Sequence, residues 1–308
     1  MESDLNSLNE RFAIPGRVTF LKGLGGLVTV RVENRHAVAM MTLAGGHVTT
    51  YAPRRDERNI FWISPNSAHT IGRAMRGGVP VCWPWFGAPP EGGFQGALQG
   101  GELPSHGVAR TQLWEMAGTR RVDDDSTEVR MVLRDNERTR AVWPYAFELE
   151  LIVTVGPRLK IEWAARNPGA EPFTYTGALH PYFAVADAQD VRVHGLDGVG
   201  YLDKNNGFRH AVQHGPVTFT GEVDYVFTGT TSALAIEDPG MGRTIRIAKS
   251  GSRTSVVWNP YHGDARLPDV GAGQHRNFVC VEAANAVDDV VTVTPGEEER
   301  LGMEIWSE

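Results

Sequence analysis

The chain has 308 residues, of which 41% are hydrophobic and 22% are charged, with a net charge of −7 at pH 7. This composition is typical of a soluble globular protein, and all-β domains reach this length as one unit, so we expect a single monomeric domain over residues 1–308. The acidic balance excludes a global nucleic-acid-binding surface, which needs a cationic excess, but it allows a few arginines to bind a small anion.

Alternation of apolar and polar residues dominates the chain. Residues 147–155 and 159–165 alternate on either side of Gly156-Pro157-Arg158, which predicts a β-hairpin. Helical periodicity over eleven or more residues is not expected, and the lack of strand–helix–strand order disfavours a parallel doubly wound sheet. We therefore predict an all-β fold, a large antiparallel β-sandwich. Further alternating runs, in chain order, are residues 27–32, 37–43, 128–133, 191–194, 233–236, 244–248, 255–258, 279–281, 290–293 and 300–306.

The first unusual segment, residues 76–87, begins with Arg76 followed by two glycines. Such a pair can bring charge and backbone close to an anion, although a surface arginine on a glycine turn has the same pattern. A long stretch rich in glycine, residues 87–101, follows, and loops of this length are often functional. Segment 103–110 ends it with His106 and Arg110, which share one face if the segment is extended.

Two later segments offer a proton donor and a proton acceptor. Alternation places His180 opposite Leu179, and its side chain titrates near neutral pH, although a lone histidine is often structural. Glu282 directly follows an apolar run, where burial would raise its pKa and suit it to act as a base, unless it reaches solvent. Trp258 begins an aromatic segment that could stack on a sugar or fill the core.

Other site classes lack support. Cys82 and Cys280 lie in apolar runs far apart, which predicts two buried free thiols without zinc-ligand spacing. His210 and His214 lack the glutamate of a metalloprotease helix, so we expect no metal. Residues 1–9 are polar, and no apolar run approaches the length of a membrane helix, so we expect a cytoplasmic protein with no membrane contact.

Taken together, the motifs resemble the hexose-6-phosphate mutarotase branch of the aldose 1-epimerase family. The matching segments keep the family's order: RGGVPVCWPWFG (76–87), LPSHGVAR (103–110), LHPYF (179–183), GLDGVGYLDK (195–204), WNP (258–260) and VCVEAANA (279–286). The resemblance implies a galactose-mutarotase-like supersandwich with a concave sugar-binding groove. It also implies an isomerase that needs no cofactor and interconverts the anomers of a hexose 6-phosphate, which would be glucose 6-phosphate.

The resemblance also implies roles for particular residues. His180 matches the general acid and Glu282 the general base. These two residues would open and reclose the sugar ring. The residues that match substrate-binding positions are Arg76 and Arg110 for the phosphate and nearby hydroxyl groups, Asp203, His106, and Ser105, which stands where the family has glutamine.

Three alternatives remain open from the sequence. Pro181 stands where this branch has threonine, as in the epimerases of free sugars, so a free-aldose 1-epimerase is the nearest alternative. A non-catalytic carbohydrate-binding protein would need the aromatic and arginine residues but no His–Glu pair. A glycoside hydrolase would use Asp203 and Glu282 as two carboxylates separated by roughly 5–5.5 or 6.5–9.5 Å.

Overall fold

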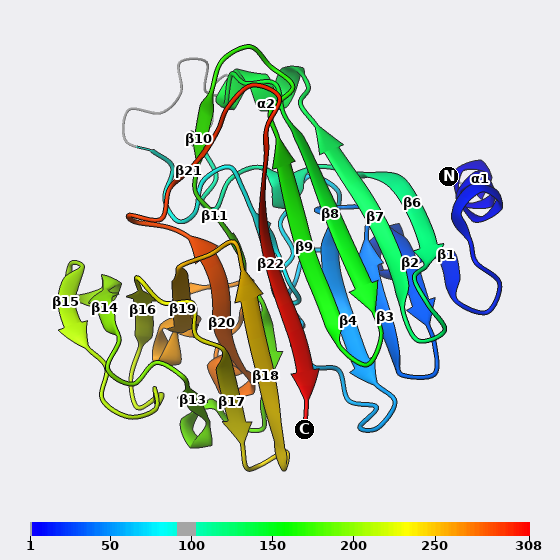
Figure 1. Cartoon of the computed structure of the whole chain (residues 1–308). Coiled ribbons are helices and arrows are strands. Elements are labelled where there is room, and N and C mark those ends of the chain that lie inside the picture. The colour runs from blue at the N-terminus through cyan, green and yellow to red at the C-terminus, as the bar shows by residue number, and fades with distance from the viewer. Residues whose placement is uncertain (1, 91–102) are drawn as a thin grey trace.

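The computed structural model describes residues 2–90 and 103–308 and consists mainly of antiparallel strands (Figure 1). Much of the long glycine-rich stretch at 87–101 lies outside the described residues. The helices are α1 (Glu2–Phe12) and α2 (Glu137–Val142), with 3-10 helices η1 (Leu24–Gly26), η2 (Ala109–Thr111), η3 (Ala188–Asp190), η4 (Lys204–Asn206), η5 (Tyr261–Arg266) and η6 (Gln274–Asn277).

The strands run through the whole described chain. They are β1 (Val18–Lys22), β2 (Val28–Glu33), β3 (Ala37–Thr42), β4 (His47–Pro53), β5 (Val81–Cys82), β6 (Glu115–Arg121), β7 (Thr127–Arg134), β8 (Glu148–Val155), β9 (Leu159–Arg166), β10 (Phe173–Tyr175), β11 (Gly177–Leu179), β12 (Tyr182–Ala184), β13 (Arg192–His194), β14 (Gly200–Asp203), β15 (Arg209–Val212), β16 (Val223–Phe227), β17 (Leu234–Asp238), β18 (Arg243–Ser250), β19 (Thr254–Asn259), β20 (Phe278–Asn285), β21 (Val291–Val293) and β22 (Glu298–Ser307).

Two eight-stranded antiparallel sheets make up most of the described fold. One has the order β13-β17-β18-β22-β9-β8-β7-β6, and its long strands cross the front of Figure 1. The other has the order β15-β14-β16-β19-β20-β11-β5, with β12 also pairing with β20. A four-stranded sheet, β1-β2-β3-β4, and the pair β10-β21 complete the strands of the described chain. This architecture confirms the predicted antiparallel β-sandwich.

The predicted hairpin shows why alternation was informative. Strands β8 and β9 pair in continuous register, with Leu151 opposite Trp163. Both side chains are fully buried in the main core, because one face of a strand in a sandwich packs against the other layer. On the outer face, Glu150 forms an ion pair with Arg130 of β7. All the other predicted alternating runs also overlap observed strands.

The expected lack of helical periodicity over eleven or more residues is wrong at the N-terminus. Helix α1 has 11 residues, and Leu5, Leu8 and Phe12 recur along it at helical spacing. These three side chains pack on the main core beside β1, so packing rather than composition stabilises the helix. Helix α2 also escaped prediction because it is short. It begins with a capping box in which the Asn136 side chain accepts hydrogen bonds from the backbone at Arg138 and Thr139.

One hydrophobic cluster runs through most of the described chain. Its members extend from Val18 in β1 to Ile305 in β22 and come from both large sheets. The single-domain organisation stays a prediction that this continuous core supports. Within residues 2–90 and 103–308, none of the helices has the length and apolar character that crossing a membrane requires.

Candidate active site

Strand β20 carries the candidate base and has two buried faces. Val281 points into the main core, whereas Glu282 and Cys280 point to the opposite face of the sheet. Cross-strand register places Val256 of β19 beside Glu282 and Trp258 of β19 beside Cys280. The apolar run that preceded Glu282 in the sequence is therefore a central strand, and the carboxyl group stands on a face that is not part of the main core.

His180 reaches the same face from the break between β11 and β12. Its Nε2 atom lies 3.4 Å from Oε1 of Glu282. Both residues are nearly buried, with exposed fractions of 6% for His180 and 2% for Glu282. The remaining atoms, Nδ1 of His180 and Oε2 of Glu282, have no hydrogen-bond partner in the described part of the chain. The structure thus brings together the two residues predicted to transfer protons, and it leaves polar atoms available for a ligand.

Burial sets the protonation of this pair. Desolvation, followed by the charge of Asp224, holds the pKa of Glu282 well above its usual range. Desolvation, followed by nearby His106 and Arg76, holds the pKa of His180 well below its usual range. The two groups therefore favour the neutral form, with the proton on Glu282 and none added to the His180 ring.

Arg76 and Arg110 both reach the cavity beside this pair, but their partners differ. Arg76 donates to the carboxylate of Asp269 from Nε at 3.0 Å, and from Nη1 to the hydroxyl of Tyr182 at 2.8 Å. Arg110 lies on η2, and within the described residues its side chain donates to Ser105, at 2.8 Å to the carbonyl oxygen and 3.3 Å to Oγ. Arg110 forms no ion pair with a carboxylate of residues 2–90 or 103–308, and its buried Nε has no partner there. The positive charge of Arg110 is therefore less neutralised by its described neighbours than the positive charge of Arg76.

His106 is held in a turn rather than in the extended conformation considered above. Its φ is 61°, and its Nδ1 accepts a hydrogen bond from the backbone N–H of Gly87 at 3.3 Å. Burial and the charge of Arg110 lower the pKa of His106 to about 3, so the ring is neutral. Because Nδ1 accepts, the proton of the neutral ring is on Nε2, which can donate to a ligand. The ring packs edge-on against His180, with centroids 5.5 Å apart.

These side chains enclose a cavity of about 230 Å³, the size of a small ligand site. Its lining includes all the predicted site residues except Asp203: Arg76, Ser105, His106, Arg110, His180 and Glu282, together with Phe86, Lys204, Asp224, Val256, Trp258 and Leu267. The sequence allowed Trp258 either to fill the core or to stack on a sugar. Because it lines the cavity, its side chain is available to a ligand.

Asp203 has a different position. Its Oδ1 accepts from the backbone of Asn205 and its Oδ2 from the side chain of Asn206, so it caps the turn of η4. The next residue, Lys204, extends to the cavity and forms an ion pair of 2.8 Å with Asp224. Lys204 and Asp224 were both missed from the sequence. Asp224 could have been found by register, since it lies opposite Trp258 on the neighbouring strand.

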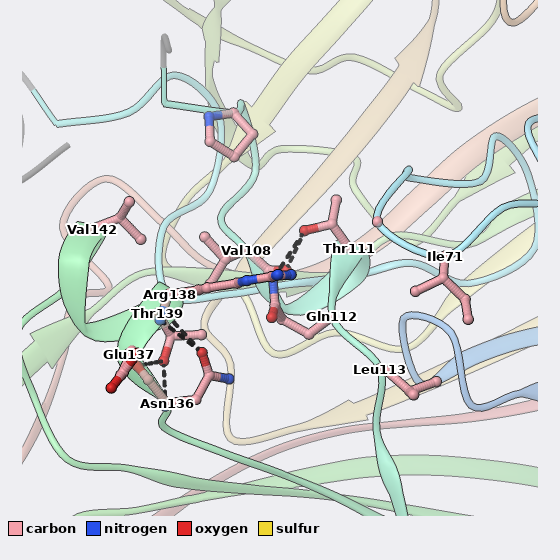
Figure 2. A pocket seen from close by; sticks show the side chains of 12 residues that line it. Ile71, Val108, Thr111, Gln112, Leu113, Asn136, Glu137, Arg138, Thr139 and Val142 are labelled. Carbon is pink, nitrogen blue, oxygen red and sulfur yellow. Dashed lines mark hydrogen bonds between the residues drawn. The ribbon is translucent and has the colours of Figure 1, made fainter. Parts of the chain in front are cut away.

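A larger cavity, of about 730 Å³, lies beside α2 (Figure 2). Among the residues that the structure describes, its titratable lining residues are Glu137 and Arg138, and neither histidine nor cysteine lines it. The hydrogen bonds drawn in Figure 2 join lining residues to one another, such as Gln112 to Thr111 at 3.5 Å and Asn136 to Thr139 at 3.1 Å. This cavity offers no pair for proton transfer.

Neither cysteine belongs to a metal or disulfide site. Cys82 and Cys280 are buried free thiols, as predicted. Burial raises the pKa of Cys82 to about 12, so the thiol stays protonated and unreactive. Within the described ranges, histidine, cysteine and carboxylate side chains form no group of three or more that could hold a metal ion.

Comparison with known proteins agrees with this geometry. Residues 28–306 match the family model described as aldose 1-epimerase. A protein of Cenchrus ciliaris, named "Putative glucose-6-phosphate 1-epimerase", is 33% identical over 86% of this chain and 80% of its own length. A protein of Escherichia coli with the same name is 33% identical over 85% of each chain. A crystal structure of a "putative mutarotase", YeaD of Salmonella typhimurium, superposes with a TM-score of 0.85 at 31% identity, covering 99% of both chains.

Proposed function

The chain belongs to the aldose 1-epimerase family, and from that premise we propose that it interconverts the α and β anomers of a hexose 6-phosphate. One observation carries the proposal: His180 Nε2 and Glu282 Oε1 lie 3.4 Å apart in a cavity that Arg76 and Arg110 also line. A base and an acid placed together meet the needs of ring opening, and the arginines supply the charge that a phosphate needs.

The proposed reaction begins with two proton transfers. Glu282, as the carboxylate, removes the proton from the anomeric hydroxyl O1, and His180, as the imidazolium, protonates the ring oxygen O5. The C1–O5 bond breaks and a C1=O1 double bond forms, which gives the open-chain aldehyde. After rotation about C1–C2, the O5 hydroxyl attacks the other face of C1. His180 then takes the O5 proton and Glu282 returns a proton to O1, so both residues are regenerated.

The neutral pair favoured by burial has a defined place in this cycle. It has the same number of protons as the Glu282 carboxylate with the His180 imidazolium. It is also the form that exists when the ring is open, before reclosure. The reaction therefore moves one proton within the pair and needs none from solution.

The phosphate is assigned to the arginine side of the cavity. Arg110, without a carboxylate partner in the described chain, keeps the charge that a phosphate would neutralise. The planar guanidinium group of arginine can grip a phosphate through two donors. Arg76 is already neutralised in part by Asp269 at 2.8 Å, so it contributes hydrogen bonds more than net charge.

The glycoside hydrolase alternative has less support. As stated from the sequence, it pairs Asp203 with Glu282 across the scissile bond, whereas Asp203 caps η4 and does not line the cavity. Asp224, the other carboxylate in the cavity lining, is held in an ion pair with Lys204. The free-aldose alternative differs only in the phosphate. Anomer exchange measured by NMR with glucose 6-phosphate and with glucose separates the two. We expect the higher kcat/KM for the phosphate, and equal values would favour the free-aldose reaction.

A further inference from the structure

No other residue in the described part of the chain orients His180 through a hydrogen bond to its Nδ1 atom. A catalytic histidine usually donates its second ring nitrogen to a carboxylate or carbonyl group, which fixes the tautomer and the plane of the ring. Here Nδ1 of His180 is buried without a partner among residues 2–90 and 103–308. Nε2 is 3.4 Å from Glu282, which is too long to define the ring plane. Another contact must hold the imidazole.

Tyr182 provides that contact. Its ring lies nearly parallel to the His180 ring, at 11°, with centroids 4.9 Å apart. Tyr182 begins β12 and lies opposite Cys280 of β20, so its side chain is on the same face of the sheet as Glu282. His106 and Trp258 meet the His180 ring edge-on. Tyr182 is therefore the aromatic side chain that stacks face to face on the imidazole in the described chain.

Tyr182 is itself fixed. It is 2% exposed, and it packs against Trp62 at 5.9 Å and Phe278 at 5.2 Å between ring centroids. Its backbone N–H donates to Gly78, and its carbonyl oxygen accepts from Trp62. Since both its backbone and its ring are held, Tyr182 can act as a rigid platform for His180.

The hydroxyl of the same tyrosine faces the cationic side of the site. It accepts a hydrogen bond from Nη1 of Arg76 at 2.8 Å, while Nε and Nη2 of Arg76 bind Asp269. One side chain thus contacts both the candidate acid, through its ring, and a candidate phosphate-binding residue, through its hydroxyl.

We propose that Tyr182 is a positioning residue that aligns two parts of the site, the His180 imidazole through ring stacking and the Arg76 guanidinium through its hydroxyl. The inference rests on the proposed anomerase function. The ring arm predicts that loss of the aromatic face misaligns proton transfer. The hydroxyl arm predicts that loss of the oxygen loosens Arg76 and so affects the binding of a phosphorylated substrate.

The two arms separate in two variants, assayed by NMR anomer exchange with glucose 6-phosphate. Tyr182→Phe keeps the ring and removes the hydroxyl, so kcat should stay near wild type while KM rises about 2- to 10-fold. Tyr182→Leu removes the ring, so kcat should fall by about 10- to 100-fold. The pH at which His180 titrates, followed by NMR of its ring signals, should move in the Leu variant and stay close to wild type in the Phe variant.

Phe183→Leu is the matched control. Phe183 is the next residue on β12, is 0% exposed and points into the main core, so its replacement should lower stability and leave kcat and the His180 signals unchanged. If Tyr182→Leu does not fold, Tyr182→Met, whose unbranched side chain adapts better to the space left by the ring, tests the ring arm. A folded variant without the ring that keeps wild-type kcat and His180 titration overturns the proposal. Lack of anomer exchange in the wild-type protein would instead overturn the proposed function.

Discussion

His180 Nε2 and Glu282 Oε1 lie 3.4 Å apart, although His180 is between β11 and β12, Glu282 is on β20, and the two residues are separated by about a third of the chain. This spacing suits two oxygens bonded to the same carbon. O1 and O5 of a pyranose both bind C1, so groups this close can exchange protons with both. A pair that served opposite sides of a glycosidic bond would need a wider gap, roughly 5–5.5 Å or more.

Replacing either member of this pair should remove proton transfer while preserving shape. We expect Glu282→Gln and His180→Asn each to lower kcat for anomer exchange by about 10²- to 10⁴-fold. Binding of glucose 6-phosphate, measured by calorimetry, should change little, because both substitutions keep a polar side chain of similar size. Wild-type exchange in the Gln variant would show that Glu282 is not the base.

The pH dependence of kcat/KM should be bell-shaped with two assignable limbs. Activity needs one proton on the pair, either on Glu282 or on His180. On the acid side, activity falls as His180 gains a proton while Glu282 still holds one, and this limb lies well below 6.5 because the pKa of His180 is lowered. On the alkaline side, activity falls as Glu282 loses its proton, and this limb lies well above 4.5 because its pKa is raised.

A pH series of NMR exchange rates checks this assignment. A profile with limbs at the ordinary values of glutamate and histidine would mean that burial does not shift the pair in the working enzyme. Loss of the alkaline limb in Glu282→Gln, measured on its residual activity, would support the assignment of that limb to Glu282.

Gly107 is a site where backbone geometry should decide stability. It has a φ of 71°, and a Cβ there would lie 2.1 Å from the carbonyl oxygen of Trp83. Gly87, with a φ of 82°, has no atom of residues 2–90 or 103–308 within 4 Å of such a Cβ. We expect Gly87→Ala to cost about 1–2 kcal/mol from the left-handed conformation alone, and Gly107→Ala to cost clearly more. Denaturant unfolding measures both, and equal losses would contradict the predicted clash.

The two arginines should differ in their effect on phosphate binding. Arg110→Ala removes the cation without a described carboxylate partner, so KM for glucose 6-phosphate should rise by about 10- to 150-fold. Arg76→Ala should raise KM less, because Asp269 already neutralises part of its charge. Activity on free glucose should hardly change in Arg110→Ala, since the phosphate is remote from C1. Equal losses on both substrates would mean that Arg110 holds the ring or the fold.

Sequence alternation predicted the strands, and the family resemblance pointed to His180 and Glu282, which the structure brings to 3.4 Å from each other. Alternation is a local signal, so β8 and β9 could be recognised without tertiary information. Lys204 could not, because its place in the cavity depends on the turn of η4, and Asp224 could be found only once the pairing of β16 with β19 is known. Helix α1 was missed because its three apolar residues acquire meaning only where they pack on the core.

For Asp203 the sequence and the structure indicate different roles. The family resemblance implies a substrate-binding carboxylate, whereas the structure supports a capping role. If Asp203 acts by fixing η4, its effect passes through Lys204, the next residue, which lines the cavity. Lys204→Met should lower kcat/KM for glucose 6-phosphate by about 10- to 150-fold, the range for a hydrogen bond from a charged group. Asp203→Ala should have a smaller effect, about 2- to 30-fold, comparable to the loss of a helix cap.

A double-mutant cycle decides between the two roles of Asp203. If the carboxylate acts only by positioning Lys204, then Asp203→Ala should add little once Lys204 is already methionine, and the double variant should have the kcat/KM of Lys204→Met alone. If Asp203 instead binds the sugar directly, the two losses should multiply. Asp203→Asn, which keeps an oxygen that can accept the backbone hydrogen bond of Asn205, should retain most activity in the first case, since it preserves the cap. Multiplying losses together with an inactive Asn variant would restore Asp203 as a ligand and displace the capping interpretation.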